Sequence, residues 1–548
     1  MTMQMHKNQS VSVHQFAMVP KSDIPRSTFV VQKTHKTTFD AGFLVPIYLE
    51  EVLPGDSFNL RMTAFARMAT PLFPVMDNLI LDSQFWFVPY RLLWTNWKKF
   101  MGEQDNPGDS ISYVIPQIVS PVGGYAINTL EDYMGLPTVG QMGAAATYSG
   151  SCLPQRAYNK IWNAWYRDQN LQSSVTESTG DGPDALGSYT LLRRGKRPDY
   201  FTTALPSPQK GASVTLPLGT SAPVRGLGMI AGTANAASGT AAWDGPGHTI
   251  PSGTWGWNVT GTNNILVDTV QSSGTASTTH APNIYADLSQ ATAATINQLR
   301  QSFQIQKLLE KDARGGTRYV EIIFQQFGVR SPDYRLQRPE YLGGGSSPIN
   351  VTPIAQTSAT GLTGGTTTLG NLSGMATTLA NKHGYTASFT EHGIVMGLVS
   401  IRADLTYQQG VQKFWNRSTR YDFYTPVFQA LGEQAVLNRE IYVKGDANDA
   451  LVFGYQERWA EYRYNPSMIT GLFRSTAAGT IDGWHLAQNF GSLPTLNTTF
   501  IQDTPPLSRV LAVGASANGK QFIFDSFFEN KMARPMPLYS VPGMIDHF

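Results

Sequence analysis

Strand-like segments in this chain are short and lie far apart, and this spacing limits the folds that the chain can adopt. The segments have the alternating or continuous apolar character of β-strands, and they lie at 57–67, 79–90, 393–407, 439–443, 450–455, 509–513 and 521–527. Strands and helices do not alternate regularly, which argues against a doubly wound α/β fold. No repeat of 20–50 residues occurs, which argues against a solenoid or propeller. We therefore expect a mainly β protein, a β-sandwich with large loop and helical insertions.

The segment Ser57–Arg67 shows the strand pattern most clearly. Its apolar positions alternate with positions that are mostly polar, and Phe65 is the exception among the latter. This alternation predicts a strand with one face in the core and the other toward solvent. Helices are expected at three insertions, over about 154–168, 289–314 and 318–327, where apolar side chains recur at helical spacing.

Long uncharged stretches divide the chain. The segment 211–286 is rich in Gly, Ala, Ser and Thr, and we interpret it as a surface insertion. The segment 343–381 has no charged residue, and we expect a loop there. The predicted organisation is an N-terminal arm at 1–40, a first part of the sandwich at 41–210, the insertion at 211–286, and the remainder of the sandwich at 287–548.

Charge is scarce for a chain of 548 residues. Asp, Glu, Lys and Arg make up 15% of the residues and the net charge is +2, whereas soluble domains carry about 25% charged residues. Two interpretations stay open: much of the surface is buried against other chains, where charge is depleted, or the surface is polar but uncharged. The single cysteine excludes an intrachain disulfide. The sequence also has no apolar run long enough for a membrane helix and no recognisable secretory signal.

Basic residues gather at two places. We consider both as contacts for nucleic-acid phosphates, with solvated turns or salt-bridged contacts as the alternative. The candidate residues of the compact run are Arg193, Arg194, Lys196 and Arg197. Those of the N-terminal arm are Lys21, Arg26, Lys33 and Lys36.

Motifs of known chemistry are weak. Residues 514–520 have the spacing of a phosphate-binding loop, but Gln521 replaces the required Ser or Thr. Asn518-Gly519 is better explained as a hairpin turn. A glycine pattern at 226–231 resembles a dinucleotide fingerprint in a glycine-rich context where chance matches are expected. Cys152 and the histidines form no catalytic or metal-binding motif. We expect no enzymatic activity, metal or cofactor.

Seven long segments resemble one known family. They include FWFVPYRLLWTNWKKFMGE (85–103), RAYNKIWNAWYRDQNLQ (156–172), KRPDYFTTALPSPQKG (196–211), SFTEHGIVMGLVSIRADLTYQQG (388–410) and FGYQERWAEYRYNPSMITG (453–471). In this order they resemble the major capsid protein of microviruses, small icosahedral single-stranded DNA bacteriophages (Microviridae), and most closely the gokushovirus branch (Gokushovirinae).

The resemblance implies an eight-stranded antiparallel jelly roll that self-associates into a T=1 shell of sixty copies. It implies a single-stranded DNA genome at the inner face, a small basic DNA-packaging protein, a scaffolding protein during assembly, and location in the virion after synthesis in the bacterial cytoplasm. The arm at 1–40 would lie on the inner face.

The insertion would form a protrusion at each threefold axis and contact a host receptor, such as a glycan. Its candidate contact residues are Trp243, Trp255 and Trp257. The alternative from another class is a soluble β-sandwich enzyme or carbohydrate-binding module, because exposed tryptophans also stack on sugars.

Overall fold

The computed structural model describes residues 25–214, 296–357, 370–512 and 519–539, together with six two-residue strands between 224 and 286. The chain divides into two compact units. The first comprises residues up to Pro208 and from Asp312 onward, and the second comprises Gln209–Lys311.

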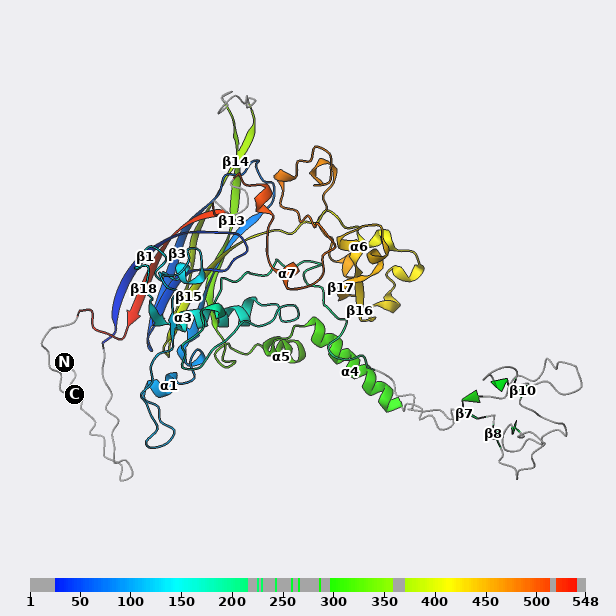
Figure 1. Cartoon of the computed structure of the whole chain (residues 1–548), viewed down its shortest axis with the longest axis horizontal. Helices are drawn as coiled ribbons and strands as arrows, with labels where there is room; N and C mark the ends of the chain where they lie inside the picture. Colours follow the sequence, from blue (N-terminus) through cyan, green and yellow to red (C-terminus); the bar gives the residue numbers. More distant parts are fainter. Residues whose placement is uncertain are drawn as a thin grey trace, which may run out of the picture. The chain divides into compact units, whose positions relative to one another are not determined.

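Eight antiparallel strands form the sheet of the first unit (Figure 1). They are β1 (Ser27–Phe39), β2 (Val45–Val52), β3 (Ser57–Met68), β4 (Leu79–Pro89), β13 (Glu340–Ala355), β14 (Leu372–Ser388), β15 (Gly393–Ala403) and β18 (Phe522–Arg534). Their spatial order is β1-β18-β3-β14-β13-β4-β15-β2.

This order is that of a jelly roll. Counted along the chain, the first strand pairs with the eighth, the second with the seventh, the third with the sixth and the fourth with the fifth. Such nested pairing arises when one long hairpin winds into two facing four-stranded halves. The halves here are β1-β18-β3-β14 and β13-β4-β15-β2, joined by the β13–β14 pair. The predicted jelly-roll fold is confirmed.

The main hydrophobic core lies between the two halves. In β3, Leu60, Met62 and Ala64 are buried while Arg61 and Thr63 between them are exposed. Aromatic rings bring the halves together, as the ring centroids of Tyr48 in β2 and Phe528 in β18 are 5.0 Å apart. Because alternate side chains of a strand point to opposite faces, the polar-apolar alternation read from the sequence places these residues correctly.

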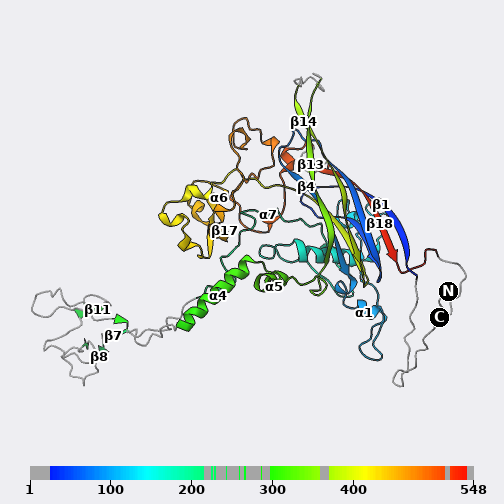
Figure 2. The same ribbon diagram turned by 180° about the vertical axis from the view of Figure 1, so that it is seen from behind.

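A second core covers the outer face of the half that contains β4 and β15. The helix α3 (Leu153–Ile161) and the π-helical turn that follows it pack there (Figure 2, cyan). The strand β15 is buried on both faces. Tyr158 of α3 donates a hydrogen bond to the Leu44 carbonyl at 2.8 Å and accepts one from the Leu192 amide at 3.0 Å. The helix predicted over about 154–168 is therefore present. It holds the connection between β4 and β13 to the eight-stranded jelly roll, which we call the barrel.

The remaining elements of the first unit are short. The helices are α1 (Trp97–Phe100), α2 (Leu130–Tyr133), α5 (Tyr319–Phe327), α6 (Asn438–Ile441) and α7 (Thr498–Ile501). The strands form two pairs, β5 (Gln117–Val119) with β6 (Ser149–Ser151) and β16 (Glu433–Leu437) with β17 (Val452–Glu457). None of the helices in the described residues is long and apolar enough to cross a membrane.

The second unit contains short strand pairs and most of the helix α4 (Ile296–Arg314). The strands β7 (Val224–Arg225) and β12 (Tyr285–Ala286) pair antiparallel, with Arg225 opposite Tyr285. The other pairs are β8 (Gly228–Met229) with β9 (Ala242–Trp243) and β10 (Asn258–Val259) with β11 (Ile265–Leu266).

Several expectations need correction. The segment 343–381, expected as a loop, forms most of β13 and β14. Within the N-terminal arm expected over 1–40, residues 27–39 form β1 because their backbone pairs along β18. Residues 439–443, expected as a strand, overlap α6 instead. The segment 509–513 contains a 3-10 turn and one isolated bridge at Leu511.

The helix expected over 289–314 also differs in its packing. It is described from Ile296, and two side chains of its expected inward stripe, Ile296 and Phe303, are 71% and 65% exposed. The hairpin turn predicted at Asn518-Gly519 and the glycine pattern at 226–231 fall wholly or partly outside the described residues.

Candidate functional site

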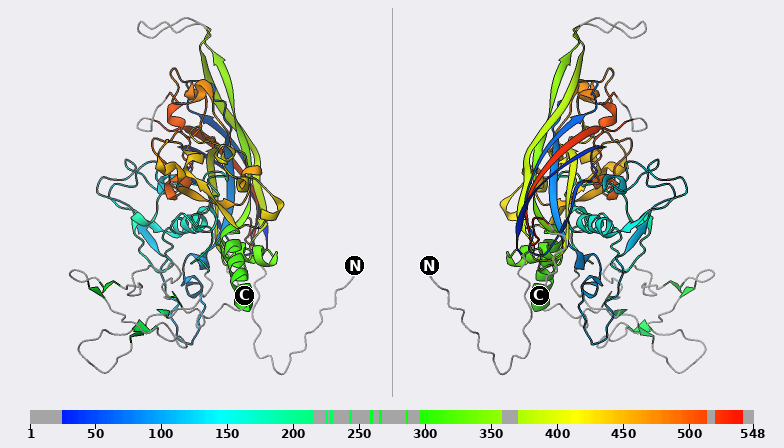
Figure 3. Two further views of the ribbon diagram at one scale, coloured as in Figure 1. Left: turned by 90° about the vertical axis from the view of Figure 1, so that its right-hand side faces the viewer. Right: turned by 90° about the vertical axis from the view of Figure 1, so that its left-hand side faces the viewer.

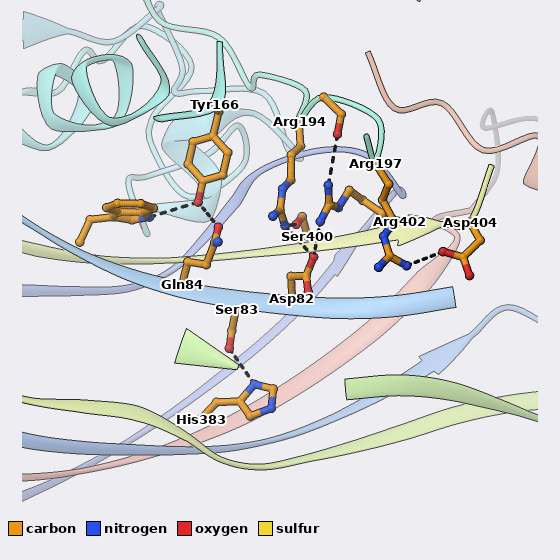
Figure 4. A network of polar contacts seen from close by, with 12 residues as sticks. Asp82, Ser83, Gln84, Tyr166, Arg194, Arg197, His383, Ser400, Arg402 and Asp404 are labelled. Atoms are coloured by element: carbon orange, nitrogen blue, oxygen red, sulfur yellow. Dashed lines mark hydrogen bonds and ion pairs between the residues drawn. The ribbon is translucent and has the colours of Figure 1, made fainter. Parts of the chain in front are cut away.

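The compact basic run lies against the ends of β4 and β15, within a network of polar contacts (Figure 4). Arg194 and Arg402 both bind Asp82, each with a nitrogen–oxygen distance of 2.8 Å. Arg194 also donates to the Ser400 hydroxyl at 2.8 Å. Burial by itself would raise the pKa of Asp82, but the two guanidinium groups outweigh it and the pKa is lowered. Asp82 is therefore a charged anchor shared by two arginines.

The backbone of the run is held as firmly as its side chains. The amide of Arg194 donates to the Gly42 carbonyl at 2.8 Å, and the Arg194 carbonyl accepts from the Asp503 amide at 2.9 Å. Gly42 has a φ of +81°, and a Cβ atom there would lie 2.0 Å from the Asp503 carbonyl oxygen. Glycine is required at this position because any side chain would displace the Asp503 segment.

Arg193 and Lys196 point into the protein. Arg193 donates to the Asp503 carbonyl at 3.0 Å and lies 3.9 Å from the centroid of the Phe43 ring. Lys196 is 8% exposed and lies 4.3 Å from the Phe500 ring centroid. Both contacts are cation–π interactions in a desolvated setting. They place the two cations where an incoming phosphate has little access.

Burial away from water shifts the pKa values of two groups in this region toward neutral pH. Burial lowers the pKa of Lys196 to about 8, although Asp503 and Asp199 favour its charged form. Burial raises the pKa of Asp503 to about 7, against the neighbouring cations Arg402 and Lys196. These shifts follow from packing among charged partners within one chain.

The other predicted cations keep more contact with solvent. Arg197 pairs with Asp404 and its side chain is 40% exposed. In β1, Lys36 pairs with Asp525 while 72% exposed, and the exposed Lys33 lies 5.8 Å from the Tyr48 ring centroid. Arg26 donates to the Gly55 carbonyl at 2.7 Å. Lys21 lies outside the described residues.

The structure thus brings Arg193, Arg194, Lys196 and Arg197 together. The first three are engaged in contacts within the chain, whereas Arg197 keeps more contact with solvent. The sequence analysis missed their partners Asp82, Arg402 and Asp503, because these lie in distant strands and segments and carry no local motif. The tryptophans of the insertion are only partly located: Trp243 lies in β9, and Trp255 and Trp257 fall outside the described residues.

A serine and a histidine meet beneath the network. Ser83 Oγ lies 2.7 Å from His383 Nδ1 (Figure 4). Ser347 Oγ lies 3.0 Å from His383 Nε2. Burial lowers the pKa of His383, so the neutral imidazole is favoured. Ser83 has no exposed surface, so this contact joins β4, β13 and β14 inside the barrel and offers no substrate a nucleophile. Across the described ranges, no group of three His, Cys, Asp or Glu side chains is placed to hold a metal ion.

A third hydrophobic cluster includes Phe201, Tyr407 and Phe453. A cavity of about 380 Å³ lies beside it, and aromatic side chains such as Trp415 and Tyr462 line the cavity. Four of its charged groups form two ion pairs, Lys413 with Glu440 at 3.3 Å and Arg417 with Glu461 at 3.3 Å, and a fifth, Arg474, donates to the Gln408 carbonyl at 3.0 Å. The cavity therefore presents mainly aromatic surface.

Taken with the strand order, these features define a jelly-roll protein whose buried charges hold insertions to the barrel. Jelly rolls of this topology occur in viral capsids, lectins and cupins, so comparison with known proteins decides among these classes.

The chain belongs to the family "Capsid protein (F protein)", whose model matches residues 17–544. It is 45% identical to "Capsid protein VP1" of Bdellovibrio phage phiMH2K, with 98% of each chain covered. It is 43% identical to "Capsid protein VP1" of Chlamydia phage 1 (98% of this chain and 99% of that one) and 36% identical to "Capsid protein VP1" of Spiroplasma virus 4 (97% and 98%).

The resemblance to gokushovirus-type capsid proteins is confirmed by these matches. The protein has the structural role of a capsid protein, it assembles into a capsid, and it is part of the virion. A soluble carbohydrate-binding module or enzyme is not favoured.

Proposed function

We propose that this capsid protein closes into a T=1 icosahedral shell of sixty equivalent copies around a circular single-stranded DNA genome. The observation that carries the proposal is the family match over residues 17–544 on an eight-stranded jelly roll. Low charge supports it, because a net charge of +2 allows like subunits to approach and interface cores are poor in charge. A closed rotational symmetry gives a finite shell.

In this proposal the cations divide between two roles. Arg193, Arg194 and Lys196 hold the segment that follows α3 to β4 and to the segment around Asp503, since their charged groups are engaged within the chain. The more exposed Arg26, Lys33, Lys36 and Arg197, with Lys21 of the arm, contact the genome on the inner face. A small basic packaging protein neutralises further phosphates, and a scaffolding protein assists assembly in the bacterial cytoplasm.

The insertion at 211–286 has a different role in the proposal. It forms the protrusion at each threefold axis, and Trp243, Trp255 and Trp257 contribute to contacts between copies or with a host receptor such as a glycan. Its sparse charge and its tryptophans suit a surface that packs against neighbours or sugars.

Cryo-electron microscopy of nuclease-treated particles from the producing culture tests the proposal. We expect a closed shell with one copy of the chain per icosahedral asymmetric unit, density above each threefold axis, and nuclease-protected single-stranded DNA inside. Recovery of the protein solely as a small soluble species, or a shell with another number of copies, would contradict it.

A further inference from the structure

The strands β13 and β14 continue past the other strands of the barrel as a two-stranded ribbon. The strand β13 pairs with β4 only as far as Ile349, and β14 pairs with β3 only from Thr377 onward. Residues 351–355 and 372–376, which we call the ribbon, have only each other as strand partners in the described part of the chain. Figure 3 shows the ribbon in yellow-green, extending past the rest of the sheet in both views.

The ribbon touches the rest of its unit along β14 and is open along β13. On the β14 side, Gly374 is buried and the Ser373 hydroxyl donates to the Pro71 carbonyl at 2.9 Å. On the β13 side, the four consecutive residues 352–355 are all exposed. Because successive side chains of a strand point to opposite faces, both faces of β13 are uncovered there.

The ribbon carries apolar side chains on both faces. Ile354 and Met375 share one face, because Ile354 pairs with Ser373, two positions from Met375. They are 47% and 39% exposed. Leu372 lies on the opposite face, directly across from Ala355, and is 37% exposed. A single exposed apolar residue is ordinary, but apolar side chains on both faces of a protruding ribbon indicate a surface that is covered by a partner.

The composition of the ribbon indicates what kind of partner covers it. The segment 343–381 that contains it has no charged residue. Protein interface cores are poor in charge, whereas DNA binding requires cations. The ribbon also has no aromatic ring on which a sugar could stack. These features favour another protein surface over nucleic acid or glycan.

The strand chemistry further limits the mode of contact. Pro353 lies in β13, the strand of the ribbon that is open. Proline on an edge strand discourages the addition of a further strand, because it has no N–H to donate. We therefore expect the partner to pack on the side chains of the ribbon and not to extend its sheet.

We propose that the ribbon is an assembly arm that packs against a second copy of this chain, with Ile354, Leu372 and Met375 as its anchors. The chain assembles into a capsid, so every subunit meets further copies of itself. The inference rests on the proposed function, because a closed shell needs such contacts at every subunit. It deepens that function by assigning one of the contacts to a defined element.

Photo-cross-linking of assembled particles tests the contact directly. The photoreactive residue p-benzoylphenylalanine takes the place of Thr352, which is exposed and lies opposite Met375. We expect irradiated particles to yield covalent dimers on denaturing gels, while unassembled subunits at equal protein concentration stay monomeric. Mass spectrometry should find the ribbon peptide joined to a second chain. Adducts confined to the same chain or to DNA would overturn the inference.

A matched pair of charge variants provides the second measurement. I354E/L372E places two acids on the ribbon, and I111E/V114E places two acids at apolar residues elsewhere that are 50% and 74% exposed. All four sites are exposed, so the melting temperature of unassembled subunits should change by less than about 3 °C in either variant. Buried anchors dominate interface energies, so I354E/L372E should lower the fraction of protein in closed shells at least about tenfold. I111E/V114E should lower it less than about twofold.

The remaining outcomes separate this inference from its rivals. Equal shell yields for the two variants would overturn the inference. Shells of I354E/L372E that form normally but fail to adsorb to host cells would also overturn it and would assign the ribbon to a receptor. If I354E/L372E does not fold, the cross-linking of Thr352 decides alone. Wild-type protein that forms no closed shell would contradict the proposed function, whereas ribbon-linked dimers in an open oligomer would still support the assembly arm.

Discussion

Charges inside this protein act in pairs, and the pair of Arg156 and Asp184 is the simplest case. Their side chains are 1% and 4% exposed, and the guanidinium donates to both carboxylate oxygens at 2.7 and 2.8 Å. Arg156 also donates to the Leu93 carbonyl at 2.9 Å. The pair therefore ties α3 to the loop after β4 and to the segment around Asp184.

We expect Asp184→Asn to lower the free energy of unfolding by about 3–5 kcal/mol, because the Arg156 charge would stay buried without its counterion. The control is Glu103→Gln, which disrupts an exposed pair whose side chains are 59% and 52% exposed. It should change stability by less than about 0.5 kcal/mol. Denaturant titration of the full-length variants at one protein concentration and pH 7 measures both. Similar effects of the two substitutions would contradict a special role for the buried pair.

The same carboxylate predicts a pH dependence. Although burial opposes ionisation, the hydrogen bonds from Arg156 and Tyr189 lower the pKa of Asp184 from its ordinary value of 3.8 to about 2. A carboxylate with a lowered folded-state pKa stabilises the fold above its unfolded pKa, and the stabilisation is lost as the pH falls through the folded-state value. We expect wild-type protein to lose about 2 kcal/mol from this group between pH 4 and pH 2. The Asp184→Asn variant should lack this part of the acid dependence, and an unchanged slope would contradict the assignment.

At the scale of elements, the pair β13–β14 determines how the two halves of the barrel join. The strand β13 pairs with β4 on one side, and β14 pairs with β3 on the other. Where β13 and β14 pair with each other, Gly344 lies opposite Gly384. A Cβ atom on Gly384 would lie 1.9 Å from the Leu60 carbonyl oxygen, and one on Gly344 would lie 2.1 Å from the Ser83 carbonyl oxygen. Glycine here permits a close backbone approach that no side chain allows.

We expect Gly384→Ala to destabilise the fold by at least about 3 kcal/mol, because the backbone of β3 must move to admit the methyl group. Gly491→Ala is the matched control, since a Cβ atom there would meet nothing within 4 Å. Comparison of the two melting temperatures at equal protein concentration gives the answer. A Gly384→Ala protein as stable as the control would show that β3 and β14 do not approach as closely as described.

Gly344 and Gly384 show why some strands of the fold could be predicted from the sequence and others could not. The alternation in β3 identified both the strand and the two faces, and the apolar runs identified β4 and β15. The glycine-rich, uncharged composition around Gly344 looked like a loop, because its strand character comes from fitting between neighbours and not from propensity. Residues 27–39 have no clear period, and their strand depends on pairing with β18 at the opposite end of the chain.

The polar network was predictable only in part, for the same reason. The run at Arg193–Arg197 was visible as the densest basic feature, but its counterions lie in β4 and near the ends of β15 and α7. Asp82 lies 112 residues from its partner Arg194 in the sequence, and Asp404 lies 207 residues from its partner Arg197.

For the whole molecule, the arrangement of the insertion suggests that barrel and surface features are separable. Within the insertion at 211–286, the strands β7 and β12 pair with each other, with Arg225 directly opposite Tyr285. Directly opposite residues are the ends that a two-residue hairpin turn connects. The barrel strands β3, β4 and β18 draw their core from residues outside 209–311.

We therefore expect that replacing residues 226–284 by Asn-Gly leaves the barrel folded, since this turn joins Arg225 to Tyr285 in their existing register. The free energy of unfolding of the first unit should change by less than about 1 kcal/mol, because the deleted residues contribute nothing to the main core. Particles of the variant should lack density above the threefold axes and adsorb poorly to host cells. Wild-type particles and a variant with Trp243→Ala alone serve as references for full and partial loss of adsorption. Collapse of the barrel on deletion would show that the insertion is part of the fold, whereas shells that adsorb normally would place the host contact elsewhere on the capsid.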